Sequence, residues 1–522
     1  MTIHDDPRFH QATGPAGDDD PETFRRWGDE LLALLQLHLE ESRAGHVRVL
    51  AQRPIEQVTR ELELSRWIRE GGMDAASLGR FVQAFLADST RLHHPACMGH
   101  QVAAPHFASA LADLVHGTIN NSTAIYEMGA PSTAIECAIT GWMVERIGFL
   151  SGGADGGGAG GDPDTGDPDI GAGALDDLAA ARAPAAERSL PRPGGVLTHG
   201  GSLANLTALL AARARIAPDA WTAGSDGKLV VIAPSSAHYS ISRAVGIMGL
   251  GTDALLALPV DRAGRAEAAA LPALCDAVAA SGRRVMAVVA SAVSTAAGVH
   301  DPLAAIADVC EARGLWLHVD GAHGASALLS PALRGRLAGI ERADSVVWDA
   351  HKLLRTSALC AAALFRDVRT LDAAFRQQAS YVGSGEDSPG VDLIGRAVEC
   401  TKSSLGLKLF LVLAAQGEAG LGRHVESLYA AAARFHDLIA ARPGFQCLCP
   451  PESNILCFRW AAHDDAAQAA LRAELVRRGE FYITQADVGG QRWLRLTIMN
   501  PNTDESVIAR LLTSIESIVA GL

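Results

Sequence analysis

The chain has 522 residues, with 45 Lys and Arg against 59 Asp and Glu, which gives a formal net charge of −14. This length is too great for one small domain, and the acidic balance argues against a general nucleic-acid binder, which needs a basic face. No run of 18 or more apolar residues predicts a membrane span, and the polar, acidic start does not have the pattern of a secretory signal.

The N-terminal part of the chain changes character at about residue 23. Residues 1–22 are rich in Asp, Gly and Pro and predict a disordered tail. Residues 23–90 include WGDELLALLQLHLEES, whose apolar residues recur every three to four positions, as in an amphipathic helix. This helical segment is either an arm that packs on a partner subunit or a layer of surface helices.

Residues 91–415 predict the large domain. Short apolar runs, several of them β-branched, alternate with Ala- and Leu-rich stretches; the runs span 228–234, 284–291, 315–321 and 345–350. This alternation is typical of a mainly parallel sheet with helices on both faces. Residues 151–190 are rich in Gly, Asp and Pro, and predict a flexible insertion without a catalytic role.

Residues 416–522 predict a smaller α/β domain. Its strand candidates are NILCFRW, FYITQ and RWLRLTIM, and helical stretches separate them. Nine cysteines are scattered over the chain without paired CxxC motifs, and Cys447 and Cys449 alone do not make a zinc site. The expectation is free thiols in a reducing cytoplasm and no metal centre.

Two glycine-containing motifs follow predicted strands, where open α/β sheets bind ligands. In THGGSLANL, Gly200 and Gly201 allow close approach of the backbone, and Ser202 lies near a helix start that favours a phosphate. Ser202 as a plain helix cap is the alternative. In HVDGAHG, Asp320 ends a strand and is suited to hold a proton on a pyridine nitrogen, or else caps a turn.

Two further motifs supply an imidazole and an amine. In SSAHYSISRA, His238 follows a strand and is suited to stack on an aromatic ring, unless it only caps a helix. In SVVWDAHKLLRTSA, Lys352 follows His351 in a weakly charged stretch, which is unusual for a solvated lysine. A lysine amine in such a pocket forms an imine with an aldehyde cofactor.

In chain order, these motifs resemble the PLP-dependent amino-acid decarboxylases, which include the glutamate, aromatic-L-amino-acid and diaminobutyrate decarboxylases. The matching motifs are GGSLANL, SSAHYSISRA, VDGAHG, DAHKLL and LRLTIMNP, and the resemblance extends from about His94 to Asn500. It implies a PLP-dependent transferase-like α/β fold of the aspartate aminotransferase type. It also implies pyridoxal 5'-phosphate (PLP) as the cofactor, held by Lys352 as a Schiff base.

The resemblance also implies roles for individual residues. Lys352, Asp320 and His238 would be catalytic: Asp320 would pair with the pyridinium nitrogen and His238 would stack on the ring. The remaining cofactor-binding residues would be Gly201, Ser202 and His351 at the phosphate, Thr295 beside the ring, and Ala322 on the face opposite His238. Substrate contacts would come from Arg495, which matches an arginine that contacts a substrate carboxylate, and from Gln101 and Asn120.

The sequence departs from the family in two places. Many relatives carry a loop tyrosine that protonates Cα, and Val391 is its nearest match here, with Tyr381 earlier in the same loop. Asp349 stands at a position that is often Asn, and an acid near a phosphate must be protonated, hydrogen-bonded or turned away.

The predicted reaction is decarboxylation of an L-amino acid to the amine and carbon dioxide. The LRLTIMNP end and the absent loop tyrosine favour a small polar substrate, acidic or diamino, over an aromatic one. Transamination, carbon–carbon lysis and aldehyde-forming oxidative deamination are alternatives on the same scaffold. A non-catalytic PLP-binding protein and a nucleotide-binding enzyme rank lower, the second because the GxxxxGK[ST] and GxGxxG patterns are absent. The resemblance implies a homodimer with a shared active site.

Overall fold

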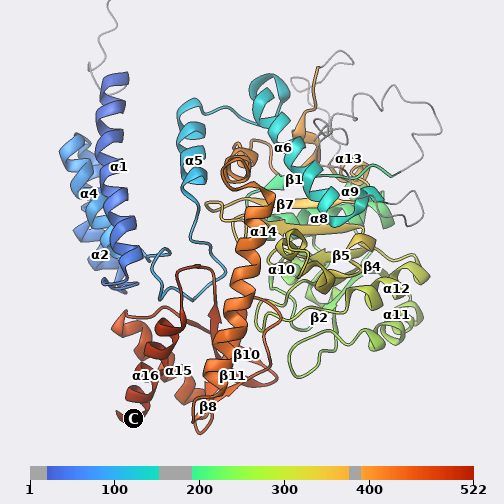
Figure 1. Ribbon diagram of the computed structural model, residues 1–522. Helices are drawn as coiled ribbons and strands as arrows, with labels where there is room; N and C mark the ends of the chain where they lie inside the picture. The colour runs from blue at the N-terminus through green and yellow to red at the C-terminus, as the bar shows by residue number, and fades with distance from the viewer. Residues whose placement is uncertain (1–19, 152–190, 376–388, 522) are drawn as a thin grey trace, which may run out of the picture. The chain divides into compact units, whose positions relative to one another are not determined.

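The computed structural model describes residues 20–151, 191–375 and 389–521 (Figure 1). Almost all of the predicted tail 1–22, the predicted insertion 151–190, and Tyr381 lie outside these ranges. The chain divides into two compact units: Met1–Cys97 with Glu474–Tyr482, and Met98–Ala473 with Ile483–Leu522. The borders expected at 90 and 416 remain predictions.

The first unit is helical where it is described. Its helices are α1 Pro21–Ala44, α2 Ile55–Glu61, α3 Leu64–Glu70 and α4 Ala75–Asp88. Helix α1 begins where Asp20 accepts hydrogen bonds from the backbone N–H groups of Glu22 and Thr23, and it ends at Gly45 in the left-handed conformation. The returning segment 474–482 closes a small core of Val49, Leu50, Cys97 and Val476.

The second unit is built on a seven-stranded sheet in the order β1-β7-β6-β5-β4-β2-β3. The strands are β1 Gly194–Thr198, β2 Leu229–Pro234, β3 Leu255–Leu258, β4 Arg284–Ser291, β5 Leu317–Asp320, β6 Ser345–Asp349 and β7 Ala361–Phe365. Strand β7 runs antiparallel to both of its neighbours, and the other adjacent pairs are parallel. The predicted mainly parallel sheet is therefore confirmed, and β2, β4, β5 and β6 are the four apolar runs of the sequence.

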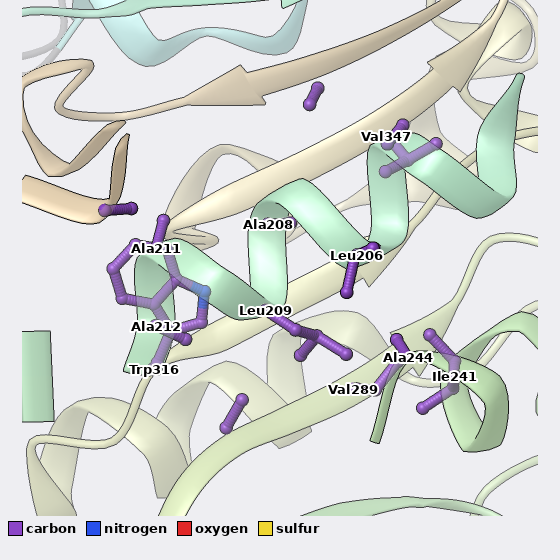
Figure 2. Packing of buried hydrophobic residues seen from close by; sticks show 14 of the residues in the cluster. Leu206, Ala208, Leu209, Ala211, Ala212, Ile241, Ala244, Val289, Trp316 and Val347 are labelled. Carbon is purple, nitrogen blue, oxygen red and sulfur yellow. The ribbon is translucent and has the colours of Figure 1, made fainter. Parts of the chain in front are cut away.

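Helices cover this sheet, whose central strands are buried throughout. They are α5 Phe107–Ile119, α6 Tyr126–Ile147, α8 Gly201–Ile216, α9 Ala220–Ala223, α10 Ser240–Ile247, α11 Leu271–Ala280, α12 Leu303–Arg313, α13 Arg369–Phe375 and α14 Leu405–Ala440. Helix α8 packs across the sheet with α10 and α13, and Figure 2 shows its Leu209 and Ala212 near Val289 and Trp316. This core fixes the start of α8, which follows the THGGS turn.

A second sheet follows α14, as the sequence predicted for this part of the chain. Its order is β10-β11-β9-β8, all antiparallel, with strands β8 Phe445–Cys447, β9 Ile455–Trp460, β10 Thr484–Val488 and β11 Gln491–Thr497. The accompanying helices are α15 Asp465–Arg478 and α16 Glu505–Gly521. Within the described ranges, α14 is the helix long and apolar enough to cross a membrane by length and composition, and it packs on α5 and α6.

Candidate active site

A cavity of about 340 Å³ lies at the carboxyl edge of the large sheet. Its walls come from the residues that follow β1, β2, β4, β5 and β6, which is where the topology of an open α/β sheet predicts a ligand. Nine of the residues predicted from sequence line it: Gln101, Gly201, Ser202, His238, Thr295, Asp320, Ala322, His351 and Lys352.

Lys352 extends from the turn after β6 toward a buried carboxylate. Its Nζ lies 3.2 Å from Oδ2 of Asp349, and Nε2 of His351 lies 3.6 Å from the same oxygen. Oδ1 of Asp349 is buried without a hydrogen-bond partner in the described part of the chain. Asp349 therefore pairs with the lysine through Oδ2 and is not turned away from the glycine turn, because its carboxylate also lies against Gly201.

The Asp320 carboxylate ends a chain of buried hydrogen bonds whose direction follows from the groups. Nδ2 of Asn205 donates to Oδ2 of Asp320 at 3.0 Å and to Oγ of Ser240 at 2.9 Å, so its Oδ1 accepts from Nε2 of His318 at 2.9 Å. Nδ1 of His318 then accepts from the Ser345 hydroxyl at 2.9 Å. Burial lowers the pKa of His318 to about 4, which agrees with a neutral ring.

His238 is held in one tautomer by the same network. Because the Ser240 hydroxyl oxygen already accepts from Asn205, its proton is available for Nδ1 of His238, 2.8 Å away. Nε2 of His238 therefore carries the ring proton. Burial lowers the pKa of His238, and the ring stays neutral near pH 7.

The turn Thr198–Ser202, called the phosphate turn below, joins β1 to α8. Gly200 has φ +103°, in the region that favours glycine, and it immediately precedes the 16-residue helix α8. A Cβ on Gly201 would lie 2.6 Å from Oδ2 of Asp349, so any larger residue there would require the carboxylate or the turn to shift. The N–H groups at this helix start are suited to bind an anion.

Two predicted substrate residues do not line the cavity. Arg495 on β11 is only 5% exposed; its Nη1 donates to the carbonyl of Gly99 and to Oγ1 of Thr484, both at 3.3 Å. Asn120 is the exposed C-cap of α5, with φ +49°. The structure therefore places Asn120 away from the walls of the cavity.

Sequence reasoning missed several residues of the cavity. His199 sits in the phosphate turn between the residues that were singled out, and Asn205 lies one helical turn after the glycines. His323 follows Ala322, and its Nε2 lies 2.6 Å from Oδ1 of Asn454, a pairing over 131 residues that no local pattern reveals. Burial lowers the pKa of His323 to about 3. Their positions inside or beside the quoted motifs were the available signal.

A larger cavity of about 450 Å³ lies at the other end of the strands, beside the start of β4 and Trp316, which Figure 2 shows next to Ala212. Three of its arginines already pair with aspartates: Arg215 with Asp344, Arg284 with Asp226, and Arg313 with Asp276. None of the chemical motifs reaches it. No group of three or more potential metal ligands occurs among the described residues.

Comparison with known proteins gives a consistent result. The family model described as "Pyridoxal-dependent decarboxylase conserved domain" matches residues 174–461. The L-2,4-diaminobutyrate decarboxylase of Rhizobium meliloti is 34% identical over 62% of this chain, and the match spans 65% of that protein's own length. The cysteine sulfinic acid decarboxylase of Mus musculus is 33% identical over 62% of this chain and 69% of its own.

Solved structures agree with the fold. The crystal structure of mouse CSAD superposes with a TM-score of 0.81 at 25% identity, covering 95% of this chain and 98% of that one. Oryza sativa TDC with PLP and tryptamine gives the same TM-score at 21% identity, covering 96% and 98%. The PLP-dependent transferase-like fold expected from the sequence is thereby confirmed.

Proposed function

The chain belongs to the family of pyridoxal-dependent decarboxylases, and from this premise we propose that it converts an L-amino acid to the amine and carbon dioxide. The observation that carries the proposal is the convergence of Lys352, Asp320 and His238 on one cavity whose far end is the start of α8. The chain spans about two thirds of the length of the first curated relatives it matches, and the reaction of this chain is therefore a proposal.

The residues present fit PLP. Gly201, which would clash with Asp349 if it bore a Cβ, leaves a backbone cradle for a phosphate. When bound, PLP supplies an electron sink for the pair of electrons released from the bond between Cα and the carboxylate. Lys352 would be the amine that holds the aldehyde group of the cofactor, and the Asp320 carboxylate would accept a hydrogen bond from a ring N–H.

The chain of hydrogen bonds behind Asp320 orients its carboxylate. Every link from Ser345 through His318 and Asn205 donates toward Asp320, so the carboxylate is stabilised and held in one orientation. His238, neutral and fixed by Ser240, offers a flat face to a stacked ring without adding charge. Ala322 and Thr295 complete the ring site in this proposal.

We infer a small polar substrate from the relatives. Nε and Nη2 of this guanidinium are buried without partners, and no carboxylate pairs with it within the described ranges. Burial lowers the pKa of Arg495, and because its side chain does not line the cavity, its contact with a substrate carboxylate stays a prediction. The names of the relatives, diaminobutyrate and cysteine sulfinic acid decarboxylases, agree with an acidic or diamino acid. An aromatic amino acid is the alternative.

The valine at position 391 favours a second reaction as the alternative to decarboxylation. The residue before it, Gly390, packs on the ring of Tyr126, and the Asp392 carboxylate accepts the backbone N–H of Tyr126 at 2.8 Å. Val391 has no proton to give to Cα. If no other group replaces the family tyrosine, the outcome shifts toward transamination or an aldehyde product.

We also propose a homodimer. One face of α5 exposes Phe107, Leu111, Leu114, Val115 and Ile119 at helical spacing, a stripe that a second copy would cover. Asn120 closes this helix and would act at the interface. Sedimentation of an active monomer would contradict the proposal.

The nine free cysteines support a cytoplasmic location.

The test is a substrate screen of the purified, PLP-loaded protein. Common amino acids, 2,4-diaminobutyrate and cysteine sulfinate are each incubated with it while carbon dioxide and amine are followed together. Equal amounts of both products from one compound support decarboxylation and identify the substrate. A spectral change of the cofactor without carbon dioxide keeps the PLP site but refutes decarboxylation as the reaction.

A further inference from the structure

Three side chains lie in a row along strand β5, on the face that α8 covers. Trp316 directly precedes the strand, and His318 and Asp320 follow at intervals of two residues, which places all three on the same side. Asn205 of α8 bonds to His318 and to Asp320, and Figure 2 shows Trp316 beside Ala212 of the same helix. Trp316 lines the larger cavity and Asp320 lines the active-site cavity. The row therefore joins the two cavities.

The indole of Trp316 adds a first link to the chain of hydrogen bonds that ends at Asp320. Its Nε1 donates to Oγ of Ser345 at 2.9 Å. The same oxygen lies 2.9 Å from Nδ1 of His318, which faces Ser345 across the paired strands β5 and β6. The side chains of Trp316, Ser345 and His318 are all buried. Bulk water therefore does not compete for these two bonds.

An indole N–H can only donate, and this property decides the roles at Ser345. The Ser345 oxygen accepts from Trp316, and its proton is left for Nδ1 of His318. In the opposite direction, Trp316 and His318 would both donate to this oxygen, and the hydroxyl proton would have no acceptor among its partners in the described part of the chain. A buried donor without an acceptor is unfavourable, so the direction toward Asp320 is preferred.

The groups in the middle of the chain can each reverse their roles. A neutral imidazole carries its proton on either nitrogen, and an amide can turn over, so His318 and Asn205 do not fix a direction by themselves. If both were reversed, Oδ1 of Asn205 would face the carboxylate of Asp320, acceptor against acceptor. Trp316 and Asp320 oppose that arrangement from the two ends. A carboxyl group accepts when ionised and donates when protonated, whereas the indole N–H has one role.

We propose that Trp316 is a positioning residue of the active site. Its N–H sets the direction of the chain that begins at Ser345, so that Asp320 receives an N–H and presents its negative charge to the ring nitrogen of the cofactor. The direction is then set before the cofactor binds, as a preorganised electrostatic environment requires. This inference rests on the proposed role of Asp320 and does not depend on which substrate the protein takes.

The first test needs no change at Trp316. Nitrogen NMR of the PLP-loaded protein with isotope-labelled histidine shows which ring nitrogen of His318 carries the proton, and His318→Gln assigns the signal. We expect the proton on Nε2, because Nδ1 accepts from Ser345. A proton on Nδ1 would overturn the proposal, because Ser345 would then accept from both of its neighbours.

The second test removes the N–H. Trp316→Phe keeps an aromatic ring in the core but has no donor for Ser345. The nitrogen NMR signal of isotope-labelled PLP in the loaded protein reports how firmly the ring nitrogen holds its proton, and we expect it to move toward that of an unprotonated ring. We expect kcat to fall about fivefold at unchanged KM, as the loss of one hydrogen bond implies. An unchanged cofactor signal in the folded variant would overturn the proposal.

Trp348→Phe is the matched control for this substitution. Trp348 is also buried, and its Nε1 donates at 2.8 Å to Oγ of Ser326, a hydroxyl outside the chain. The control should lower the unfolding free energy as Trp316→Phe does, but it should leave the cofactor signal unchanged. An equal shift of the signal in both variants would mean that lost packing is the cause, and the proposal would fall.

Ser345→Ala interrupts the chain directly after Trp316. In that background Trp316→Phe should add no further change to the cofactor signal, because effects carried by one chain are not additive. A full additional shift would show that Trp316 acts by another route and would overturn the proposal. Asp320→Asn separates the inference from its premise: a cofactor signal that does not respond to this change would refute the proposed contact of Asp320 with the ring nitrogen, and not the direction of the chain.

Discussion

At the Asp320 end of the cavity, called the fixed end below, the hydrogen bonds between the side chains have one possible direction, whereas at the phosphate turn the carboxylate of Asp349 lies against Gly201 and keeps one oxygen without a partner among the described residues. The first end contains two neutral imidazoles, the half-buried His238 and the buried His318, that lead to a single carboxylate. The second is partly exposed and combines Glu399 and Asp349 with imidazoles. The comparison teaches that directed hydrogen bonds fix the carboxylate expected at the cofactor ring, whereas the backbone of the turn and the carboxylate beside it shape the site expected for the phosphate.

The largest effect should follow from removal of the residue that lies between the two ends. Lys352→Ala removes the amine that forms the Schiff base and also the cation at 3.2 Å from Asp349. We expect turnover to fall at least a thousandfold, because the covalent attachment and the local charge are both lost. Carbon dioxide release under saturating PLP measures this, with circular dichroism as the folding control. Turnover within tenfold of the wild type would refute the role assigned to Lys352.

The substitution Asp320→Asn tests the fixed end most directly. This change preserves shape but removes the charge that holds a proton on the cofactor ring nitrogen, and one side of the new amide faces Nδ2 of Asn205, a donor. We expect kcat to fall about 10²- to 10³-fold, in the range found for other fixed electrostatic groups. Steady-state kinetics at saturating PLP provide the measurement. If KM alone changed, Asp320 would act in binding and not in the reaction.

The dependence of the unfolding free energy on pH should reveal the neutral imidazole of His318 at the fixed end. The pKa of His318 is about 4 in the fold against 6.5 for the free side chain, because burial disfavours the charged ring. Its contribution is therefore present above pH 6.5 and is lost as the pH falls toward 4, by about 3 kcal/mol at most. Burial also lowers the pKa of His300 to about 4, so this residue adds to the loss of stability in acid. Burial raises the pKa of Asp301 to about 6, so Asp301 has the opposite effect on the unfolding free energy as the pH falls from about 6 to 4.

Denaturant unfolding at several pH values isolates this contribution. His318→Gln can still donate to Asn205 but does not titrate, so its unfolding free energy should fall less between pH 6.5 and 4 than that of the wild type. The exposed His46, changed to Gln, is the matched control and should leave the slope unchanged. Parallel curves for the wild type and His318→Gln would show that His318 is not held neutral by the fold.

The sequence placed the residues of the fixed end better than the partners of His199 at the phosphate turn, for a physical reason. Asp320, His238 and Lys352 each follow an apolar strand, and parallel strands bring their carboxyl ends together, so local pattern was enough to place them. Glu399 and Ser403 lie about 200 residues from His199 and belong to no strand or helix, so their pairing depends on how the segment before α14 packs. The same limit applies to Asn120: the resemblance placed it in the substrate pocket, and in the structure it is the exposed C-cap of α5, so its role stays a prediction.

The smallest effect should come from the backbone of the phosphate turn. In Gly201→Ala, the new Cβ would lie 2.6 Å from Oδ2 of Asp349, so the carboxylate or the start of α8 must shift, and we expect PLP affinity to fall about tenfold with little change in unfolding free energy. Gly246→Ala is the control, because that glycine is exposed on α10 with nothing within 4 Å, and alanine there should leave binding unchanged. Fluorescence titration with PLP compares the two. Asp349 also faces Lys352, so a shift of its carboxylate would change the surroundings of the lysine as well. A spectral change of the bound cofactor in Gly201→Ala, but not in Gly246→Ala, would show that the phosphate turn influences Lys352 through Asp349. Equal affinities in both variants would mean that the phosphate does not approach Gly201 closely.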